Sequence, residues 1–497
     1  MLHYWNLRVS WLDPQYALTS WARTGFVLLM IWAAQFGVLA VRIFAALISA
    51  FTMWQTIKLA EDLRLKNSHL AGLLFILQPL VFALSNDVMT EVPMALGVVI
   101  ALRLWFAERW SASCLLVSFL PLVRPEGFLL VPVWGLFLLA LPYNSEHPNF
   151  IKRIQIGSLL AAGFLLFLLA CLFITGDILY YVHEWSWAYE SGTKNGELLH
   201  HFYKWFEYCG ALLFPIFIVG IIPSLKKRMA LPWAVWLVVI VTHSIFYWRG
   251  IFGSVGFMRI MACTASVTAI ICLYGWNRIV AWIEAKPDPE DSQNLQLRES
   301  PIALRPRASH FPVHKKFKLA STSAVLFIGV LIAVAYYVYD PMHYRWVLAR
   351  EAADYVKANH LLAGSPKYFI SDTMVMAELN IPAEHVLDNI DKRLRRGPLL
   401  WLSLDREKNL ATLREMPAGT IGVWDDELGR FWHKIKPEEF PQLGYTILYR
   451  TTQQTENGKH QLFRSMFNRY LKGYEQEVIV VKKNGEMKPP VDLITKR

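Results

Sequence analysis

The chain has 497 residues, of which 55% are hydrophobic, and it contains 20 Trp, 20 Tyr and 29 Phe. The apolar residues come in runs of membrane-spanning length, which excludes an ordinary soluble protein and indicates a polytopic helical membrane protein. The formal net charge of +11 does not indicate nucleic-acid binding, because much of the excess lies in loops between apolar runs, where basic residues orient membrane proteins. The five cysteines lie in or beside apolar runs, with neither a disulfide framework nor a CxxC metal signal.

The first 276 residues are predicted to form one transmembrane domain. Residues 1–24 are aromatic and polar, and Asp13-Pro14 is expected to break any helix there. Residues 25–37 are apolar but too few to cross the hydrocarbon, which predicts an interfacial or re-entrant helix. The membrane spans predicted in this domain are 40–59, 69–85, 92–107, 112–124, 127–142, 155–175, 207–223, 231–248 and 260–276.

The remainder of the chain divides into three parts. Residues 277–318 carry charges, Pro, Ser and Gln without apolar periodicity, which indicates a cytoplasmic linker. A last transmembrane helix is predicted at 319–339. Residues 341–497 combine a helix-like pattern with short β-type runs, which predicts a small α/β domain. The helix pattern covers 345–362, and the β-type runs are 367–371, 420–424, 445–449 and 477–481.

Alternate loops between the spans differ strongly in Lys and Arg. The rich set includes Lys152–Arg153 and Lys226–Arg228, and the positive-inside rule places it in the cytoplasm. Both termini, the C-terminal domain and the loops with Asp87 and Arg124 then face outward. The expected location is a bacterial inner or plasma membrane, with an extracytoplasmic C-terminal domain.

The first candidate site lies in a short break between apolar runs, LSNDVMTEVP, which holds Asp87 and Glu91. The two carboxylates share one face if the break is helical. Paired carboxylates suit general-base catalysis or the binding of a metal ion, so these two are the candidate catalytic residues. Helix capping by Asp87, with Glu91 in the first turn before Pro93, is the structural alternative.

Two further breaks carry arginines. Arg124 precedes a proline, so its backbone is expected to be extended, and its guanidinium can bind a phosphate or carboxylate. Contact with lipid headgroups, or a pair with Glu126, is the alternative. Residues 247–259 place Arg249 and Arg259 around three glycines, which favours an anion site, with headgroup anchoring as the alternative. Arg124, Glu126, Arg249 and Arg259 are candidate substrate-binding residues.

An outward loop at 176–206 is dense in Trp, Tyr and His. Two interpretations stay open: an aromatic belt at the membrane interface, and a sugar-binding rim in which carbohydrate faces stack on rings. His183 and Trp185 are its candidate substrate-binding residues. No metal-ligand spacing is present, and a divalent cation at the carboxylates stays open. The acidic run at 425–427 predicts a solvated turn.

Four stretches carry a family resemblance: SNDVMTEVPMAL, VRPEGFLL, GDILYYVHEW and FGSVGFMRI. Together, over about residues 25–276, they resemble the polytopic GT-C glycosyltransferases, especially the bacterial protein O-mannosyltransferase and aminoarabinose-transferase group. The resemblance implies transfer of a sugar from a polyprenyl-phosphate carrier to a lipid, glycan or protein acceptor on the outer face. It also implies that Glu91 lies near the sugar, Arg124 near the active mouth and Arg259 near the carrier phosphate.

The sequence departs from this family at its beginning. Family members start with a transmembrane helix and an outward loop whose acidic motif carries the catalytic base. Neither is visible here, and Asp13, the only early carboxylate, has an Asp-Pro setting that does not match. Either the reading frame begins further upstream, or the usual base is absent.

The favoured hypothesis is an inverting membrane glycosyltransferase dependent on a polyprenyl-phosphate sugar. A transporter or flippase would also explain the spans and the charges at membrane depth, but it predicts paired broken helices in matching halves, and we find no convincing internal repeat. A non-catalytic glycolipid-binding relative would explain the missing acidic loop.

Overall fold

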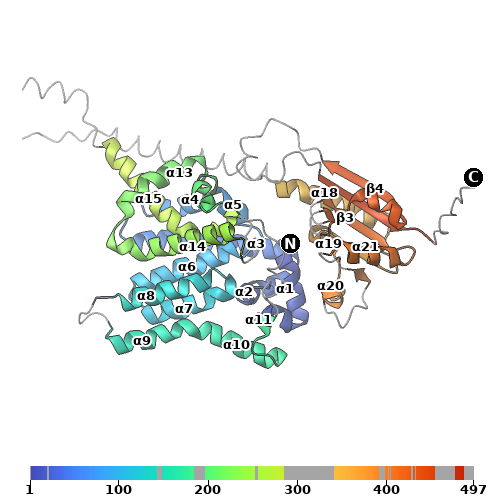
Figure 1. Ribbon diagram of the computed structural model, residues 1–497. Coiled ribbons are helices and arrows are strands. Elements are labelled where there is room, and N and C mark those ends of the chain that lie inside the picture. The colour runs from blue at the N-terminus through green and yellow to red at the C-terminus, as the bar shows by residue number, and fades with distance from the viewer. Residues whose placement is uncertain are drawn as a thin grey trace, which may run out of the picture. The chain divides into compact units, whose positions relative to one another are not determined.

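The computed structural model of the chain is mainly helical, with one small sheet in its C-terminal region (Figure 1). It describes residues 2–19, 22–142, 148–183, 196–251, 256–284, 341–390, 398–400, 402, 405–426, 429–430, 433–453 and 476–485. The predicted linker from 285 onward and the predicted last membrane helix at 319–339 lie outside the described residues. The predicted fold class, a helical transmembrane bundle with a small α/β domain, is confirmed.

Contacts divide the chain into two compact units. The helical unit comprises Arg23–Phe26 and Arg42–Tyr336. The sheet unit comprises Met1–Ala22, Val27–Val41 and Tyr337–Arg497. The N-terminal residues therefore group with the C-terminal sheet, whereas composition predicts a transmembrane domain over 1–276; those predicted boundaries stay predictions.

Each predicted span between residues 40 and 276 is matched by a helix or by a broken pair of helices. Apolar side chains dominate these helices, and the breaks fall at polar residues, glycine or proline. The helices between residues 24 and 284 are α2 (Thr24–Ala34), α3 (Val38–Asp62), α4 (Leu70–Ile76), α5 (Pro79–Leu84), α6 (Glu91–Phe106), α7 (Trp110–Val123), α8 (Gly127–Leu139), α9 (Phe150–Ser158), α10 (Ala162–Thr175), α11 (Tyr180–His183), α12 (His200–Tyr203), α13 (Trp205–Ser224), α14 (Ala230–Arg249) and α15 (Ala265–Glu284).

Four helical stretches in the described part are long and apolar enough to cross a membrane: Val38–Asp62, Phe150–Thr175, Lys227–Arg249 and Met258–Trp282. A fifth would be the bent pair His200–Gly210 and Leu212–Ser224. The helices at the other predicted spans are shorter than the ~20 residues that a straight crossing needs.

The first helix, α1 (Leu2–Leu12), is not expected from the sequence. The expected break does occur, but only at its end, where Asp13 caps the short 3-10 helix Pro14–Leu18 and accepts a hydrogen bond from the Gln15 amide at 3.1 Å. The Gln15 side chain donates to the other carboxylate oxygen at 2.7 Å. Both oxygens of Asp13 thus take part in local structure.

Helices α13 and α15 approach each other at two glycines. A Cβ on Gly275 would lie 1.9 Å from the Ile216 carbonyl oxygen, and one on Gly220 would lie 2.0 Å from the Ile271 carbonyl oxygen. Backbone therefore packs directly on backbone, as small residues permit between membrane helices.

Arg153 on α9 is a charged residue that is only 1% exposed. Its guanidinium donates to the carbonyl of Leu139 (2.9 Å), the last residue of α8, and to three carbonyls after that helix: Leu141 (2.6 Å), Pro142 (2.8 Å) and Pro148 (2.7 Å). These include carbonyls at the C-terminal end of α8, which lack helical partners and carry partial negative charge.

We expect Arg153→Met to lower the free energy of unfolding by about 2–4 kcal/mol, because buried carbonyls would lose their charged donor. The matched control is Lys152→Met, since Lys152 is the exposed neighbour. Thermal unfolding of both variants in detergent would measure the difference. Equal melting temperatures would contradict this role of Arg153.

The sheet unit contains a five-stranded mixed sheet in the order β2-β1-β3-β5-β4. Strands β2, β1 and β3 are parallel, while β5 is antiparallel to both β3 and β4. Its strands are β1 (Tyr368–Ile370), β2 (Leu399–Leu400), β3 (Ile421–Asp425), β4 (Tyr445–Gln453) and β5 (Gln476–Lys483), and its helices after residue 340 are α18 (Pro341–Ala358), α19 (Thr373–Glu378), α20 (Ala383–Ile390) and α21 (Arg406–Glu415). All four predicted β-type runs are confirmed as strands, and β2 is an addition.

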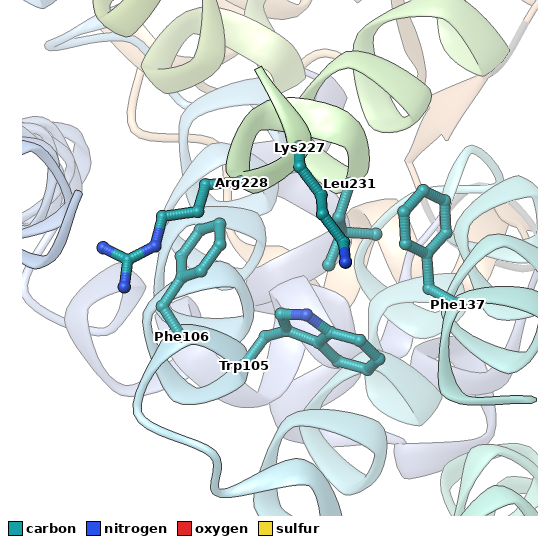
Figure 2. Close-up of a pocket in the computed structure, with 6 residues that line it drawn as sticks. All are labelled: Trp105, Phe106, Phe137, Lys227, Arg228 and Leu231. Carbon is teal, nitrogen blue, oxygen red and sulfur yellow. The ribbon is translucent and has the colours of Figure 1, made fainter. Parts of the chain in front are cut away.

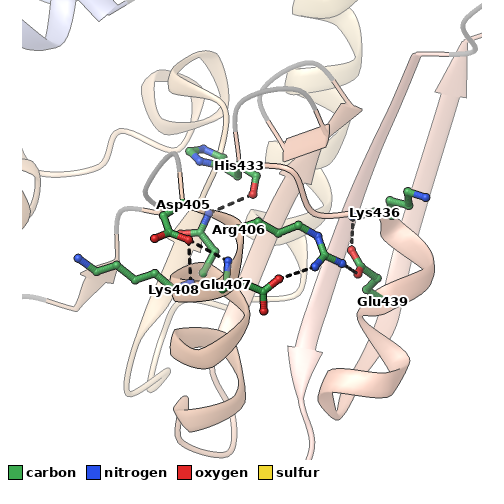
Figure 3. Close-up of polar contacts among 8 residues, drawn as sticks. Asp405, Arg406, Glu407, Lys408, His433, Lys436 and Glu439 are labelled. Carbon is green, nitrogen blue, oxygen red and sulfur yellow. Dashed lines mark hydrogen bonds and ion pairs between the residues drawn. The ribbon is translucent and has the colours of Figure 1, made fainter. Parts of the chain in front are cut away.

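Aromatic and aliphatic side chains form the core of this sheet, among them Phe369, Trp424 and Phe440. Polar contacts fix its surface helices (Figure 3). Asp405 caps α21 by accepting from the amides of Glu407 (3.0 Å) and Lys408 (3.3 Å), and Arg406 pairs with Glu439.

The prediction of a solvated turn at 425–427 is wrong for its first two residues. Asp425 ends β3 and is 2% exposed, and its carboxylate accepts a hydrogen bond from Ser371 at 2.7 Å. Asp426 is also buried and pairs with Arg430. Burial raises the pKa of Asp426 against the opposing effect of Arg430. Local partners, not water, therefore satisfy these carboxylates.

Candidate active site

A buried network of charges lies where α6 begins and α7 passes into α8. Glu91 is 2% exposed and Glu126 is 4% exposed. Arg124 joins them: its Nη1 lies 2.9 Å from Glu91 Oε1, and its Nε and Nη2 each lie 3.0 Å from one oxygen of Glu126. Two carboxylates thus share one arginine in a nearly dry setting, where ion pairs are strong and unpaired charges are costly.

The chain on either side fixes this geometry. Arg124 has the predicted extended backbone before Pro125 and ends α7, which sends its side chain toward α6. Its Nη1 also donates to Thr90 Oγ1 at 2.7 Å, next to Glu91 at the first position of α6. Four contacts of 3.0 Å or less therefore hold the Arg124 guanidinium.

Side chains of α3 hydrogen-bond to the non-helical segment 85–90, which precedes α6. Arg42 Nε donates to the Asn86 carbonyl at 3.1 Å, and Ser49 Oγ donates to the Ser85 carbonyl at 2.8 Å. The break contains turns and bends rather than helix, so Asp87 and Glu91 do not share a helix face. Asp87 is half-buried and accepts from the Val88 amide at 2.7 Å.

Arg259 approaches the network from a different segment, the 3-10 helix Met258–Thr264 that leads into α15. Its Nε lies 3.6 Å from Glu91 Oε1, and its side chain is 42% exposed. The guanidinium also lies 4.9 Å from the centre of the Phe257 ring. Compared with Arg124, Arg259 is loosely held and open to solvent.

The second carboxylate oxygen of Glu91 takes no part in these ion pairs. Its Oε2 is buried and has no hydrogen-bond partner in the described residues. Buried carboxylate oxygens are normally satisfied, and an exception marks a place where a ligand or water can be expected.

His243 belongs to this site, although it is not among the residues predicted from the sequence. It lies within α14, is 8% exposed, and its Nε2 is 3.2 Å from Glu126 Oε1. The signal for it in the sequence is a single titratable residue inside the apolar run WLVVIVTHSIF, and such residues at membrane depth are functional candidates by default.

The other predicted residues do not join the network in the described structure. Arg249, at the end of α14, is exposed and lies 4.1 Å from the centre of the Trp248 ring. His183 is exposed and pairs with Asp177 at 2.7 Å, an interaction that lowers the pKa of Asp177. Trp185 lies outside the described residues. The structure thus brings together Glu91, Arg124, Glu126 and Arg259.

A metal cluster is not formed by the part of the chain that the structure describes: no three His, Cys, Asp or Glu side chains there could hold one ion. The five cysteines are free and buried.

No model of a known protein family matches the sequence, and no curated protein does. The fold, in contrast, matches two solved structures of ArnT from Cupriavidus metallidurans. The structure bound to undecaprenyl phosphate aligns with a TM-score of 0.52 and 12% identity, over 92% of this chain and 87% of that chain. The apo structure aligns with a TM-score of 0.50 and 10% identity, over 92% and 86%.

At this identity the match establishes the fold and not the activity. It covers 92% of this chain, which is more than the stretch of the sequence resemblance. The chain therefore has a GT-C-like membrane fold, similar to that of the aminoarabinose transferase ArnT.

Proposed function

We propose that the protein is a membrane glycosyltransferase that takes a sugar from a polyprenyl-phosphate carrier. The observation that carries the proposal is the buried Glu91–Arg124–Glu126 network, with the accessible Arg259 beside it. It supports the proposal in combination with the fold, because one of the similar ArnT structures has undecaprenyl phosphate bound.

Within this proposal the two arginines have different roles. Arg124 is held by two carboxylates and Thr90, so it positions Glu91 rather than binding substrate. Among the described residues Arg259 has one ionic contact, at 3.6 Å, and its side chain is 42% exposed, so it can turn to the carrier phosphate. A guanidinium at that place would stabilise the negative charge that develops on the departing phosphate.

The reaction is an inverting displacement. The acceptor hydroxyl oxygen attacks the anomeric carbon of the sugar, and the bond from that carbon to the phosphate oxygen breaks. The polyprenyl phosphate leaves with the bonding electron pair, and a carboxylate takes the hydroxyl proton. Asp87 suits this step better than Glu91, since it is half-buried rather than buried and is not paired with an arginine in the described residues.

The test is transfer of a labelled sugar from a polyprenyl-phosphate donor to membrane acceptors by the purified full-length chain. We expect Asp87→Asn to lower kcat by about 10²–10⁴-fold with little change in KM, because general-base catalysis contributes about that much. Asp62→Asn is the matched control, as an exposed carboxylate that pairs with Arg103 outside the network. Wild-type kcat in Asp87→Asn would remove Asp87 from the mechanism.

Arg259→Ala has a separate expected result. Loss of an accessible cation at the phosphate would raise KM for the donor and also lower kcat, together by about tenfold or more in kcat/KM. Arg109→Ala is the control, since Arg109 is exposed before α7 and lies outside the network. Binding of the donor without any transferred product, in the wild-type chain, would instead favour the transporter or non-catalytic hypothesis.

A further inference from the structure

A second candidate site lies beside α6, α8 and α14, at the end of each helix that is farther from the Glu91 network. A cavity of about 240 Å³ is lined by Trp105, Phe106, Phe137, Lys227, Arg228 and Leu231 (Figure 2). Trp105 and Phe106 end α6, whereas Glu91 begins it. At 1.5 Å per residue, 16 residues of helix separate the two ends by roughly 24 Å.

Helices α8 and α14 also place the cavity at the end that is farther from the Glu91 network. Phe137 lies near the end of α8, which Glu126 precedes, and Leu231 lies at the start of α14, twelve residues before His243. The cavity is therefore not part of the Glu91 network.

The lining combines an apolar base with cationic groups. Trp105, Phe106, Phe137 and Leu231 supply apolar surface, and in Figure 2 the Lys227 side chain extends toward Trp105 while Arg228 runs beside Phe106. No carboxylate pairs with Lys227 or Arg228 in the described part of the chain. The cavity thus has a net positive charge.

A third donor is present in the lining. The indole nitrogen of Trp105 lies on the side of the ring nearest Lys227 in Figure 2, and the described residues offer it no hydrogen-bond acceptor. An ammonium, a guanidinium and an indole N–H next to apolar rings suit a ligand with an anionic head and an apolar body.

The position within the chain identifies the source of such a ligand. Lys227 begins one of the four stretches that can cross a membrane, Lys227–Arg249. The ends of membrane-crossing helices lie at headgroup depth, where Trp, Lys and Arg meet lipid phosphates.

We propose that this cavity binds the phosphate of an anionic membrane lipid in the leaflet opposite the Glu91 network. Lys227, Arg228 and the Trp105 indole contact the phosphate, and the apolar base receives the first carbons of the lipid chains. The proposal does not depend on the transferase activity.

The experiment measures retention of phosphatidylglycerol by the purified full-length chain, by native mass spectrometry after exchange from phosphatidylcholine nanodiscs. We expect Lys227→Gln with Arg228→Gln to weaken retention about tenfold or more, since each cation near an anionic headgroup contributes substantially. Trp105→Phe, which keeps the ring and removes the N–H, should weaken it a few-fold. Leu231→Trp, which fills the cavity and keeps both charges, should also weaken it.

The control variant, Lys66→Gln with Lys152→Gln, removes two exposed basic residues that do not line the cavity, and it should retain phosphatidylglycerol as the wild type does. Equal losses of phosphatidylglycerol retention in the two double variants would show that surface charge in general, and not this cavity, retains the lipid. That result would overturn the proposal. Wild-type retention in the Lys227/Arg228 variant would overturn it too. Displacement of the lipid by millimolar inorganic phosphate would assign the cavity to a soluble phosphate instead. Melting temperatures in phosphatidylcholine alone show whether each variant is folded.

Discussion

Arg124→Met should be among the most destabilising single substitutions in the helical unit, with a loss of about 3–5 kcal/mol in the free energy of unfolding. The reason is that one guanidinium satisfies two carboxylates, Glu91 and Glu126, which are 2% and 4% exposed. Removing one partner of a buried pair leaves a poorly compensated charge. Here it leaves two, with only Arg259 at 3.6 Å from Glu91 and His243 at 3.2 Å from Glu126. The melting temperature and the yield of monodisperse protein in detergent would measure the loss.

A triple variant that removes all three charges separates the effect of unpaired charge from the effect of the changed side-chain shape. When Glu91→Gln and Glu126→Gln are added to Arg124→Met, no uncompensated charge remains, and much of the lost stability should return. Activity should stay absent in the triple variant, because the network no longer positions the site. A triple variant less stable than Arg124→Met would contradict the charge-pair explanation.

Gly275→Ala should separate helices α13 and α15 and destabilise the protein by about 2–4 kcal/mol. A new Cβ would lie 1.9 Å from the Ile216 carbonyl oxygen, and rigid backbone cannot move aside as a flexible side chain can. Gly220→Ala should behave in the same way, because its Cβ would lie 2.0 Å from the Ile271 carbonyl oxygen.

Gly135→Ala is the matched control for this pair. It lies within α8, and its new Cβ would meet only Leu160 Cδ1, at 3.6 Å. Ordinary contact and better helix propensity should leave the stability unchanged or slightly higher. Thermal unfolding of the three variants would test the contrast, and equal melting temperatures would refute the backbone-on-backbone packing.

Most of the charge network is predictable from the sequence. Charges beside long apolar runs stand out, and Asp87, Glu91, Arg124 and Glu126 all lie at such breaks. The pairing of Arg124 with Glu126 is one of the alternatives that the sequence allows, and it occurs together with a second pair to Glu91. The sequence does not indicate that Arg124 is fully paired with carboxylates whereas Arg259 stays accessible to solvent. That difference depends on the distances between segments more than 100 residues apart.

Other differences have local causes. Helix α1 is not predicted because Asp13-Pro14 is expected to prevent a helix, whereas a proline ends a helix only at the residues before it. Strand β2 has only two residues, too few for an alternation pattern. Asp425 and Asp426 are expected in solvent because short acidic runs are usually solvated, but Ser371 and Arg430 satisfy them within the sheet unit.

The place of α1 has a consequence for how the protein is made. The indole of Trp5 donates to the Thr373 carbonyl at 3.1 Å, across 368 positions of sequence. A ribosome that adds about 5–20 residues per second would need roughly 20 to 70 s to supply that partner. Tyr4, Trp5 and Leu7 of α1 are buried in the folded protein. During this interval they would be exposed, while the helical unit is inserted and packed. Helix α1 is therefore synthesised long before the partner that it needs at Thr373, and it is where a chaperone or the membrane surface would be needed most.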